Sequence, residues 1–306
     1  PGFGIATVEK IAINAVMAGC RTEYLPVLIT AVQCISEPQL NLRIKAMSTG
    51  PHAPLILVNG PIARELKINS KVCALGPGAP SFANTVIGRA LRLVMMNVGH
   101  TYPTISDMDT IGSPAKYSLC AAENEEDSPW EPYHVEKGYS KEDSAVTVVF
   151  VMGQSELHDF VNYEPERLAR VFCSAAMNIA DVATGMWLQG RRTDPRHGTN
   201  EKDTGLMFIC PEHAHNFAKA GWSKQDIREH MYKQSKLSFE TLMTNKIPAA
   251  VMASHPELQW LFDAPETLVP IFETPDCFHI AVVGGQAGRG TYFYANGSPI
   301  TKPVER

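Results

Sequence analysis

Apolar residues along this chain fall in short runs that alternate with longer segments of helical periodicity. The strongest run, residues 146–152 (VTVVFVM), is rich in β-branched residues and apolar on both faces, which is typical of a buried strand. Residues 8–18 and 82–98 carry the spacing of apolar positions that predicts helices. Further strands are predicted at 55–59, 72–75, 117–122, 206–210 and 278–283, and further helices at 164–188 and from 211 onward. This alternation predicts an α/β fold, with a layered, mostly parallel sheet or sheets flanked by helices.

A division of the chain is predicted near residue 142, because a new series of strand and helix begins there. The N-terminal α/β half would span 1–142 and carry the candidate site, and the C-terminal α/β half would span 143–306. Two similar halves are one reading of this pattern, and a single layered domain is the other.

The composition is that of an ordinary globular protein, with 306 residues, of which 44% are hydrophobic and 19% charged. A formal net charge of −5 gives no electrostatic reason to expect nucleic acid or an anionic membrane as partner. The longest clean apolar stretch, 145–152, is far shorter than the roughly 20 residues that span a bilayer. We therefore expect neither a nucleic acid nor a membrane partner.

Cysteine usage points to a reducing compartment. The seven cysteines are odd in number, dispersed and without a CxxC pair, which favours free thiols and a cytoplasmic location. The chain starts at Pro1 without a methionine or a charged and apolar leader, so we expect it to be a processed piece of something longer.

Residues 117–136 (YSLCAAENEEDSPWEPYHVE), called the acidic segment below, are the richest candidate for the wall of a site. The segment holds six carboxylates together with a cysteine, a tryptophan and a histidine. Crowded carboxylates raise one another's pKa values, which is how an acid–base pair arises. We predict that Glu123, Glu125 and His134 share acid–base duty and that Trp130 helps to bind substrate.

The acidic segment has other interpretations. Glu123, Glu126 and His134 are candidate ligands for a divalent metal, although no HExxH-type spacing supports them and the sequence demands no cofactor. The segment could also be a solvated acidic turn in which Trp130 is a hydrophobic plug.

Two residues outside the segment are candidates for chemistry. Cys20 lies between a flexible Gly19 and a cationic Arg21, which would favour its thiolate and make it a nucleophile or redox thiol. The alternative is a small thiol that only packs. His52, in the turn GPHAP, sits on backbone stiffened by proline that could orient it into a cleft as a supporting base.

An anion-binding feature precedes the helix predicted at 82–98. The turn GPGAPS at 76–81 places backbone N–H groups at a helix N-terminus, although it matches neither GxGxxG nor a P-loop. Asn84 and Arg89 on that helix are predicted to anchor the substrate, with Arg92 one turn from Arg89. Alternatively, the two arginines pair with the carboxylates at 123–127.

Further predicted substrate-binding residues are Asn59 and His158. Asn59 ends the strand predicted at 55–59. His158 follows the strongest strand, at the edge where open α/β sheets bind ligands.

Several stretches together resemble an uncharacterised family whose members accompany, or are fused to, small thiol or selenol proteins with a UGSC or CGSC motif. No reaction is established for that family. The stretches are residues 6–27, 52–69, 83–99, 114–138 and 212–228, which together span much of the chain.

The resemblance implies a redox partner. The UGSC motif is absent here, so the reactive selenol or thiol would belong to another chain or to a missing part. By analogy, glycine reductase joins a substrate-binding subunit to a selenol subunit, which suggests reductive or thiol-addition chemistry. The family pattern commonly has His-Asn where His158-Asp159 stands here, which puts the role of His158 in doubt.

The sequence thus predicts an enzyme, or its substrate-binding subunit, acting on a small anionic or thiol-containing molecule. Reductive, thiol-addition or lyase chemistry would make it an oxidoreductase or a lyase, and we expect an oligomer. The alternative is a non-catalytic subunit of an assembly that docks a partner on the acidic segment. If the enzyme reading is right, one cavity should receive five residues: Cys20, His52, Asn84, Glu123 and His134.

Overall fold

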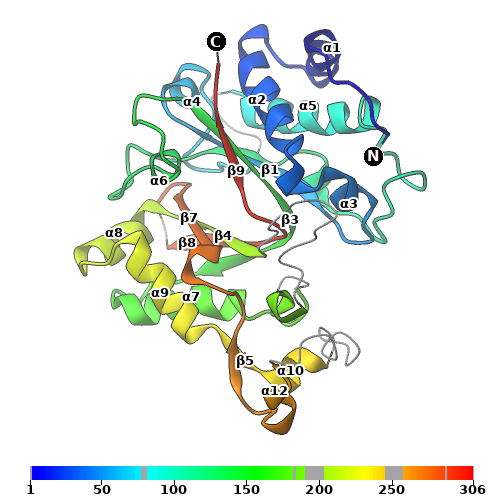
Figure 1. The fold of residues 1–306 in the computed structure, drawn as a ribbon. Coiled ribbons are helices and arrows are strands. Elements are labelled where there is room, and N and C mark those ends of the chain that lie inside the picture. Colours follow the sequence, from blue (N-terminus) through cyan, green and yellow to red (C-terminus); the bar gives the residue numbers. More distant parts are fainter. Residues whose placement is uncertain are drawn as a thin grey trace.

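The structure, a computed structural model, describes residues 2–76, 81–181, 184–189, 203–244, 258–286 and 288–305. One sheet runs through the molecule (Figure 1). The helices of the first half of the chain form one group against it, and those of the second half form another. The α/β class and the flanking helices predicted from the sequence are confirmed.

The main sheet has seven strands, in the order β2-β1-β3-β8-β4-β7, with β9 paired to β3. Their bounds are β1 Ala53–Asn59, β2 Cys120–Ala122, β3 Ala145–His158, β4 Thr204–Ile209, β7 Phe278–Val282, β8 Arg289–Ala295 and β9 Ile300–Pro303. A separate small sheet pairs β5 (Lys236–Ser238) with β6 (Leu268–Pro270).

The main sheet is mixed. Its outer pairs, β1–β2 and β4–β7, are parallel, whereas β1–β3, β3–β8, β3–β9 and β4–β8 are antiparallel. The parallel pairing predicted for most of the sheet is therefore found only at its two ends. A parallel neighbour needs a long crossover connection, and β1–β2 and β4–β7 have one that contains helices. The connections β2–β3 and β7–β8 contain no long helix in the described residues, and the chain returns antiparallel.

The two halves repeat one arrangement. In each half the first strand (β1 or β4) lies between a parallel second strand (β2 or β7) and an antiparallel third strand (β3 or β8). Because β3 and β8 pair with each other, both halves share one sheet. The outer strands also meet, because the backbone N–H of Asn124, just after β2, donates to the carbonyl of Val282, the last residue of β7, at 2.7 Å. Similar halves are thus present, and the division at 142 stays a prediction.

Helices cover the outer face of each half (Figure 1). The first half carries α1 Val8–Ala18, α2 Leu25–Ile35, α3 Leu42–Met47, α4 Pro61–Glu65, α5 Ala83–Asn97 and α6 Tyr133–Glu136. The second half carries α7 Pro165–Ala176, α8 Pro211–Lys219, α9 Lys224–Gln234, α10 Phe239–Met243 and α12 Trp260–Asp263. Short 3₁₀ helices lie at Thr22–Tyr24, Pro38–Leu40, Pro114–Lys116, Met186–Gln189 and Pro275–Cys277.

The predicted strand at 72–75 is wrong. The segment is a turn with Cys73 at a positive φ of 60°, and the Asn69 side chain holds it by accepting from the Lys71 N–H and donating to the Val72 carbonyl. A short apolar run beside glycine and proline was a poor guide because this local side-chain bonding stabilises a turn instead. The helix predicted at 164–188 ends early, at Ala176.

The sheet is buried on both faces, which explains its apolar strands. On the outer face, Ile56 and Val58 pack in a core with α2 and α5. On the inner face, Leu55 and Leu57 pack in a core shared with Phe293 and other residues of the second half. Alternate side chains of β1 therefore serve two cores, and the inner one joins the halves.

In the part of the chain that the structure describes, no helix has the length and apolar character required to cross a bilayer.

Candidate functional site

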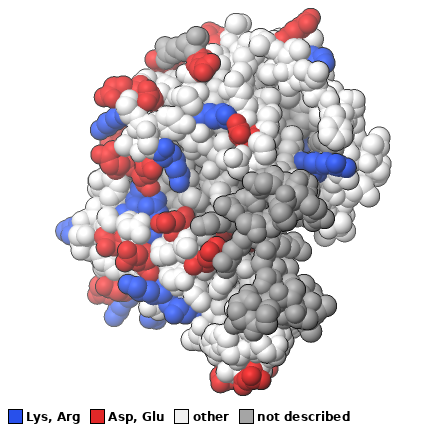
Figure 2. Space-filling model, in the orientation of Figure 1, with Lys and Arg blue, Asp and Glu red and all other residues white. Residues whose placement is uncertain are grey.

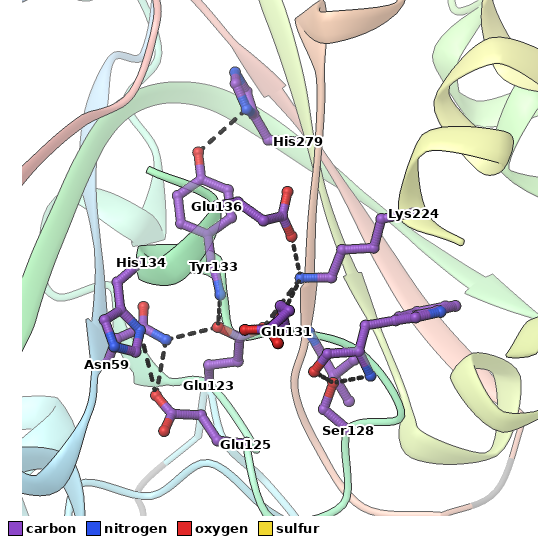
Figure 3. A network of polar contacts seen from close by, with 12 residues as sticks. Asn59, Glu123, Glu125, Ser128, Glu131, Tyr133, His134, Glu136, Lys224 and His279 are labelled. Atoms are coloured by element: carbon purple, nitrogen blue, oxygen red, sulfur yellow. Dashed lines mark hydrogen bonds and ion pairs between the residues drawn. The ribbon is translucent and has the colours of Figure 1, made fainter. Parts of the chain in front are cut away.

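Glu123 is the centre of a buried polar network at the ends of β1 and β2 (Figure 3). Its Oε2 accepts from the Asn59 Nδ2 at 2.6 Å and from the Tyr133 backbone N–H at 2.7 Å. Its Oε1 accepts from the Val282 N–H at 3.3 Å and lies 3.7 Å from the Lys224 Nζ. Burial raises the pKa of Glu123, against the opposing influence of Lys224 and these donors. Glu123 therefore joins β1, α6, β7 and α9 at one point.

Glu125 caps the end of β1. Its Oε1 accepts from the Gly60 N–H at 2.7 Å and from the Asn59 Nδ2 at 3.0 Å, while its Oε2 lies 3.6 Å from Arg64. Gly60 has a φ of +82°, and a Cβ there would lie 2.1 Å from the Asp143 carbonyl oxygen. Only glycine fits this turn, and it brings the N–H within reach of the carboxylate.

His134 lies beside Glu125 on α6. The His134 Nδ1 is 3.8 Å from the Glu125 Oε1, and the side chain is 0% exposed. Neither ring nitrogen has a hydrogen-bond partner among the residues that the structure describes. A buried imidazole with both nitrogens unsatisfied is unusual, because buried polar groups are nearly always hydrogen-bonded.

A second layer of charge comes from α9. Lys224, which is buried, donates to the Glu131 carbonyl at 2.9 Å and pairs with Glu136, and Arg228 pairs with the same Glu136 carboxylate. The Tyr133 hydroxyl lies 3.1 Å from the His279 Nδ1, extending the network to β7 (Figure 3). The network therefore crosses between the two halves of the molecule.

This network opens on a cavity of about 290 Å³ beside α4, called the α4 cavity below. Its charged lining includes three cations and three carboxylates: Arg64, Lys67, Lys71, Glu123, Glu125 and Glu126. Lys71 pairs with Glu126 at 2.9 Å, whereas no partner of the Lys67 ammonium is found among the described residues. Acidic and basic side chains are also intermixed on the face of the molecule that carries α6 and α8 (Figure 2).

The structure thus brings together Asn59, Glu123, Glu125 and His134, with Glu126 on the same cavity. The predicted convergence of five residues on one cavity is wrong, because Cys20, His52 and Asn84 lie away from Glu123 and His134. Cys20 is not part of this group. Its thiol donates to the Val86 carbonyl at 3.3 Å and packs against the outer core of the first half. Burial raises the pKa of Cys20 to about 11, because a thiolate is poorly solvated there. The positive charge of Arg21, which was expected to favour the Cys20 thiolate, does not outweigh this effect of burial.

His52 also lies elsewhere, at the start of β1, where its Nδ1 is 3.3 Å from the Gly50 carbonyl oxygen. Burial, followed by the charges of Lys45 and Lys116, lowers the pKa of His52 to about 4. Its predicted meeting with the acidic segment does not occur in the described network.

Asn84 holds backbone rather than an open cavity. Its Oδ1 accepts from the Asn69 N–H, and its Nδ2 donates to the carbonyls of Asn69, Ala74 and Cys120. The turn that was to complete an anion site with Asn84 includes residues 77–80, which lie outside the described residues.

Arg89 and Arg92 line a different cavity, of about 680 Å³. Arg92 pairs with Asp107 at 2.8 Å, and Lys116 pairs with both Asp107 and Asp109. In the described residues Arg92 therefore pairs with Asp107 and not with the acidic segment, so this alternative prediction is wrong for Arg92.

Trp130 and His158 are separated from the α4 cavity lining. The Trp130 indole N–H donates to the Trp222 carbonyl at 3.1 Å and its ring packs on the core of the second half, as the plug interpretation proposed. His158 ends β3, where its ring stands 6.0 Å from that of Phe160 in a tilted contact.

No cluster of three or more His, Cys, Asp or Glu side chains arranged to hold a metal ion is found among the described residues. In the network, the oxygens of Glu123 and Glu125 already face amide, guanidinium and ammonium donors.

Sequence reasoning missed the cations that surround the carboxylates, which are Arg64, Lys67, Lys71, Lys224 and Arg228. One signal was available. Lys224 lies within the Ser223–Asp226 capping box and Arg228 comes one helical turn later, which places both on one face of α9. Which carboxylates that face would meet depends on the sheet that brings β2 and β7 together.

No protein-family model, curated protein or solved structure matches this chain. The resemblance to the UGSC-associated family therefore stays a prediction.

Proposed function

We propose that this chain is an enzyme, or the substrate-binding subunit of one, that performs acid–base chemistry on a small anionic molecule in the α4 cavity. One observation carries the proposal: three cations and the carboxylates of the network line the same cavity, next to a buried imidazole for which no hydrogen-bond partner is found in the described part of the chain. The reaction class that suits these groups is proton removal and elimination, as in a lyase.

The cations would bind the substrate. Lys67 contributes an ammonium without a partner among the described residues, and Arg64 has only a contact of 3.6 Å with Glu125, which an incoming carboxylate or phosphate could replace. An arginine guanidinium can hold such a group through two parallel hydrogen bonds.

Glu125 and His134 would move the proton. Glu125 lines the cavity and lies next to the His134 ring, so a proton taken from the substrate has an adjacent acceptor. Glu123 would position the pair, because it holds Asn59, which also donates to Glu125. Cys20 has no role in the proposed mechanism, since its thiol donates to the Val86 carbonyl, away from the α4 cavity.

The burial of Glu123, Tyr133 and His134 supports a cavity over a flat docking face for the acidic segment. All seven cysteines are free, which supports a reducing, cytoplasmic location. A redox partner chain and an oligomer remain predictions.

The first test is binding. Thermal unfolding would be measured with acetate, succinate, citrate and inorganic phosphate, since a ligand that binds the folded state raises Tm with concentration. We expect Arg64→Gln and Lys67→Gln to weaken the best anion by about 10-fold or more, equivalent to about 1.4 kcal/mol. Lys233→Gln, which removes an exposed lysine from α9, is the matched control and should leave the affinity unchanged.

The second test is proton transfer. Exchange of the C–H hydrogen next to the carboxylate of a bound acid would be followed by NMR in D₂O. Glu125→Gln should slow this exchange by about 100-fold or more, while the anion still binds. Equal exchange rates in Glu125→Gln and wild type, or the absence of any stabilising anion, would contradict the proposal. If Cys20→Ser lost the C–H exchange, Cys20 would take part in the reaction, as the sequence predicted.

A further inference from the structure

Cys210 occupies a special position at the end of β4. It is the N-cap of α8, whose first residue is Pro211, and its backbone is extended, with φ −66° and ψ 156°. Its side chain lines a cavity of about 340 Å³, called the cysteine cavity below, together with Cys73, Gln154, Gly284 and Arg289. Helix α8 has nine residues, so its first N–H groups stabilise negative charge at this point.

His213 follows Cys210 by three residues and is only 2% exposed. Its Nε2 lies 2.8 Å from the carbonyl oxygen of Asp159. A carbonyl can only accept, so the proton of the neutral ring is on Nε2 and Nδ1 has a free lone pair. Nδ1 is buried and has no hydrogen-bond partner within the described ranges. A base held in one tautomer by a backbone carbonyl is therefore present one turn from the thiol.

The two side chains influence each other. Burial acts to raise the pKa of Cys210, but the influence of the neighbouring His213 outweighs burial and holds that pKa below its usual value. Burial acts to lower the pKa of His213, but the Cys210 thiolate and the Asp159 carbonyl raise it overall. The contrast with the other thiols is clear, because burial raises the pKa of Cys20 to about 11 and that of Cys34 to about 12.

We propose that Cys210 is a nucleophilic thiol, with His213 as its base, and that it exchanges with a small disulfide bound in the cysteine cavity. This site is separate from the α4 cavity and does not rest on the function proposed for it. Residues 70 and 71 line the α4 cavity, whereas residues 72–75 line the cysteine cavity.

The step is thiol–disulfide exchange. The His213 Nδ1 takes the proton of Cys210, and the sulfur attacks one sulfur of R–S–S–R. The S–S bond of the small molecule breaks, the Cys210–S–S–R bond forms, and R–S⁻ leaves and takes up one proton. A second thiol, such as another molecule of RSH, reverses the reaction. The step needs no donor for a developing oxyanion, and the presence of the Cys73 thiol on the same cavity favours sulfur chemistry.

The experiment uses the intact chain and dithiodipyridine as the small disulfide. Release of thiopyridone gives the rate between pH 5.5 and 9, and mass spectrometry of acid-quenched peptides identifies the modified cysteine. At pH 6, Cys210 should react about 10-fold faster than Cys73, the exposed thiol of the same cavity, because His213 acts as its base. Cys210→Ser should remove the fast phase, and Cys73→Ser should keep it.

His213→Gln separates a base from a structural residue, since the Gln amide can still donate to the Asp159 carbonyl. We expect the rate at pH 6 to fall about 10-fold and the midpoint of the pH profile to rise to that of an ordinary thiol. A merely structural His213 would change Tm and leave the midpoint in place, which would overturn the proposal.

A second measurement does not depend on access of the reagent. The thiolate absorbance near 240 nm, taken as the difference between wild type and Cys210→Ser, should titrate below the ordinary thiol pKa of about 8.5. A difference signal that titrates at or above that value would overturn the proposal, as would a Cys210 that stays unmodified while Cys73 reacts.

Discussion

The end of β1 and the end of β4 occupy equivalent places in the two halves, yet they carry different chemistry. Each strand is followed by one N-cap residue and a proline that starts a helix, with Gly60 before α4 and Cys210 before α8. At β1 the neighbouring loop supplies carboxylates, and Glu125 accepts from the Gly60 N–H. At β4 the neighbouring loop is rich in glycine, and Cys210 is followed by His213 in the first turn of α8 instead.

Backbone geometry explains part of this difference. Gly60 has φ +82° and ψ −168°, a conformation that only glycine adopts readily, and the Asp143 carbonyl fills the space of a side chain. Cys210 is in ordinary extended backbone and has room for a side chain on the cavity. The same strand arrangement therefore places the start of a helix at the end of β1 and at the end of β4. The φ angle of the N-cap residue decides whether that residue can carry a reactive side chain.

The largest expected effect is on stability at the first of these sites. Glu123→Ala should lower the free energy of unfolding by about 3–5 kcal/mol, because it removes the acceptor of three buried N–H donors and one of the two carboxylates beside the buried Lys224. Cys210→Ala should cost about 1 kcal/mol. Urea unfolding at pH 7 measures the free energy of unfolding of both variants. Equal decreases in the two variants would contradict the predicted difference between the ends of β1 and β4.

A matched control removes charge from an exposed pair. Lys71 and Glu126 are both more than half exposed, so Lys71→Met should change the free energy of unfolding by less than about 0.5 kcal/mol.

The next effect concerns pH and lies at the opposite end of β1. The pKa of His52 is lowered to about 4 by burial, so the unfolded chain binds more protons than the folded one between about pH 6.5 and pH 4. Stability should therefore fall as pH falls through this window, by up to about 3 kcal/mol. His52→Gln should flatten that part of the profile.

Urea unfolding at several pH values measures this prediction. An unchanged slope in His52→Gln would assign the acid sensitivity to other groups. If the unfolding free energy of His52→Gln depends less on pH than that of wild type, acid destabilises the protein at the start of β1. The pH dependence of any reaction at the other end of β1 can then be measured in that variant without this effect.

The smallest of the three effects is the steric one. Gly60→Ala should destabilise the protein by about 1–3 kcal/mol from the backbone conformation alone. Unfolding measurements on Gly60→Ala and on Cys210→Ala give the comparison directly, since both variants place the same side chain at equivalent positions. A neutral Gly60→Ala would mean that the β1 turn tolerates a side chain, and backbone geometry would not explain the difference.

The sequence by itself determined the α/β class, most of the strands and the place of the carboxylate network. These follow from local information. Apolar periodicity identifies β1, β3 and α5, and the density of charge with Trp130 and His134 marked the acidic segment as the wall of a cavity. Glu123, Glu125, His134 and Asn59 do lie together.

Only the tertiary structure decided which partners those residues meet. The antiparallel pairing of β3 with β8 joins the halves, and β7 and α9 then reach Glu123 through Val282 and Lys224. The reactivity of the thiols was likewise beyond the sequence. Cys20 has a cationic neighbour but is half-buried beside a carbonyl, whereas Cys210 has a helix N-terminus and an imidazole held by Asp159. The physical reason is that charge and thiol chemistry depend on solvation and on distances of a few ångström, and both are set by packing between residues far apart in the chain.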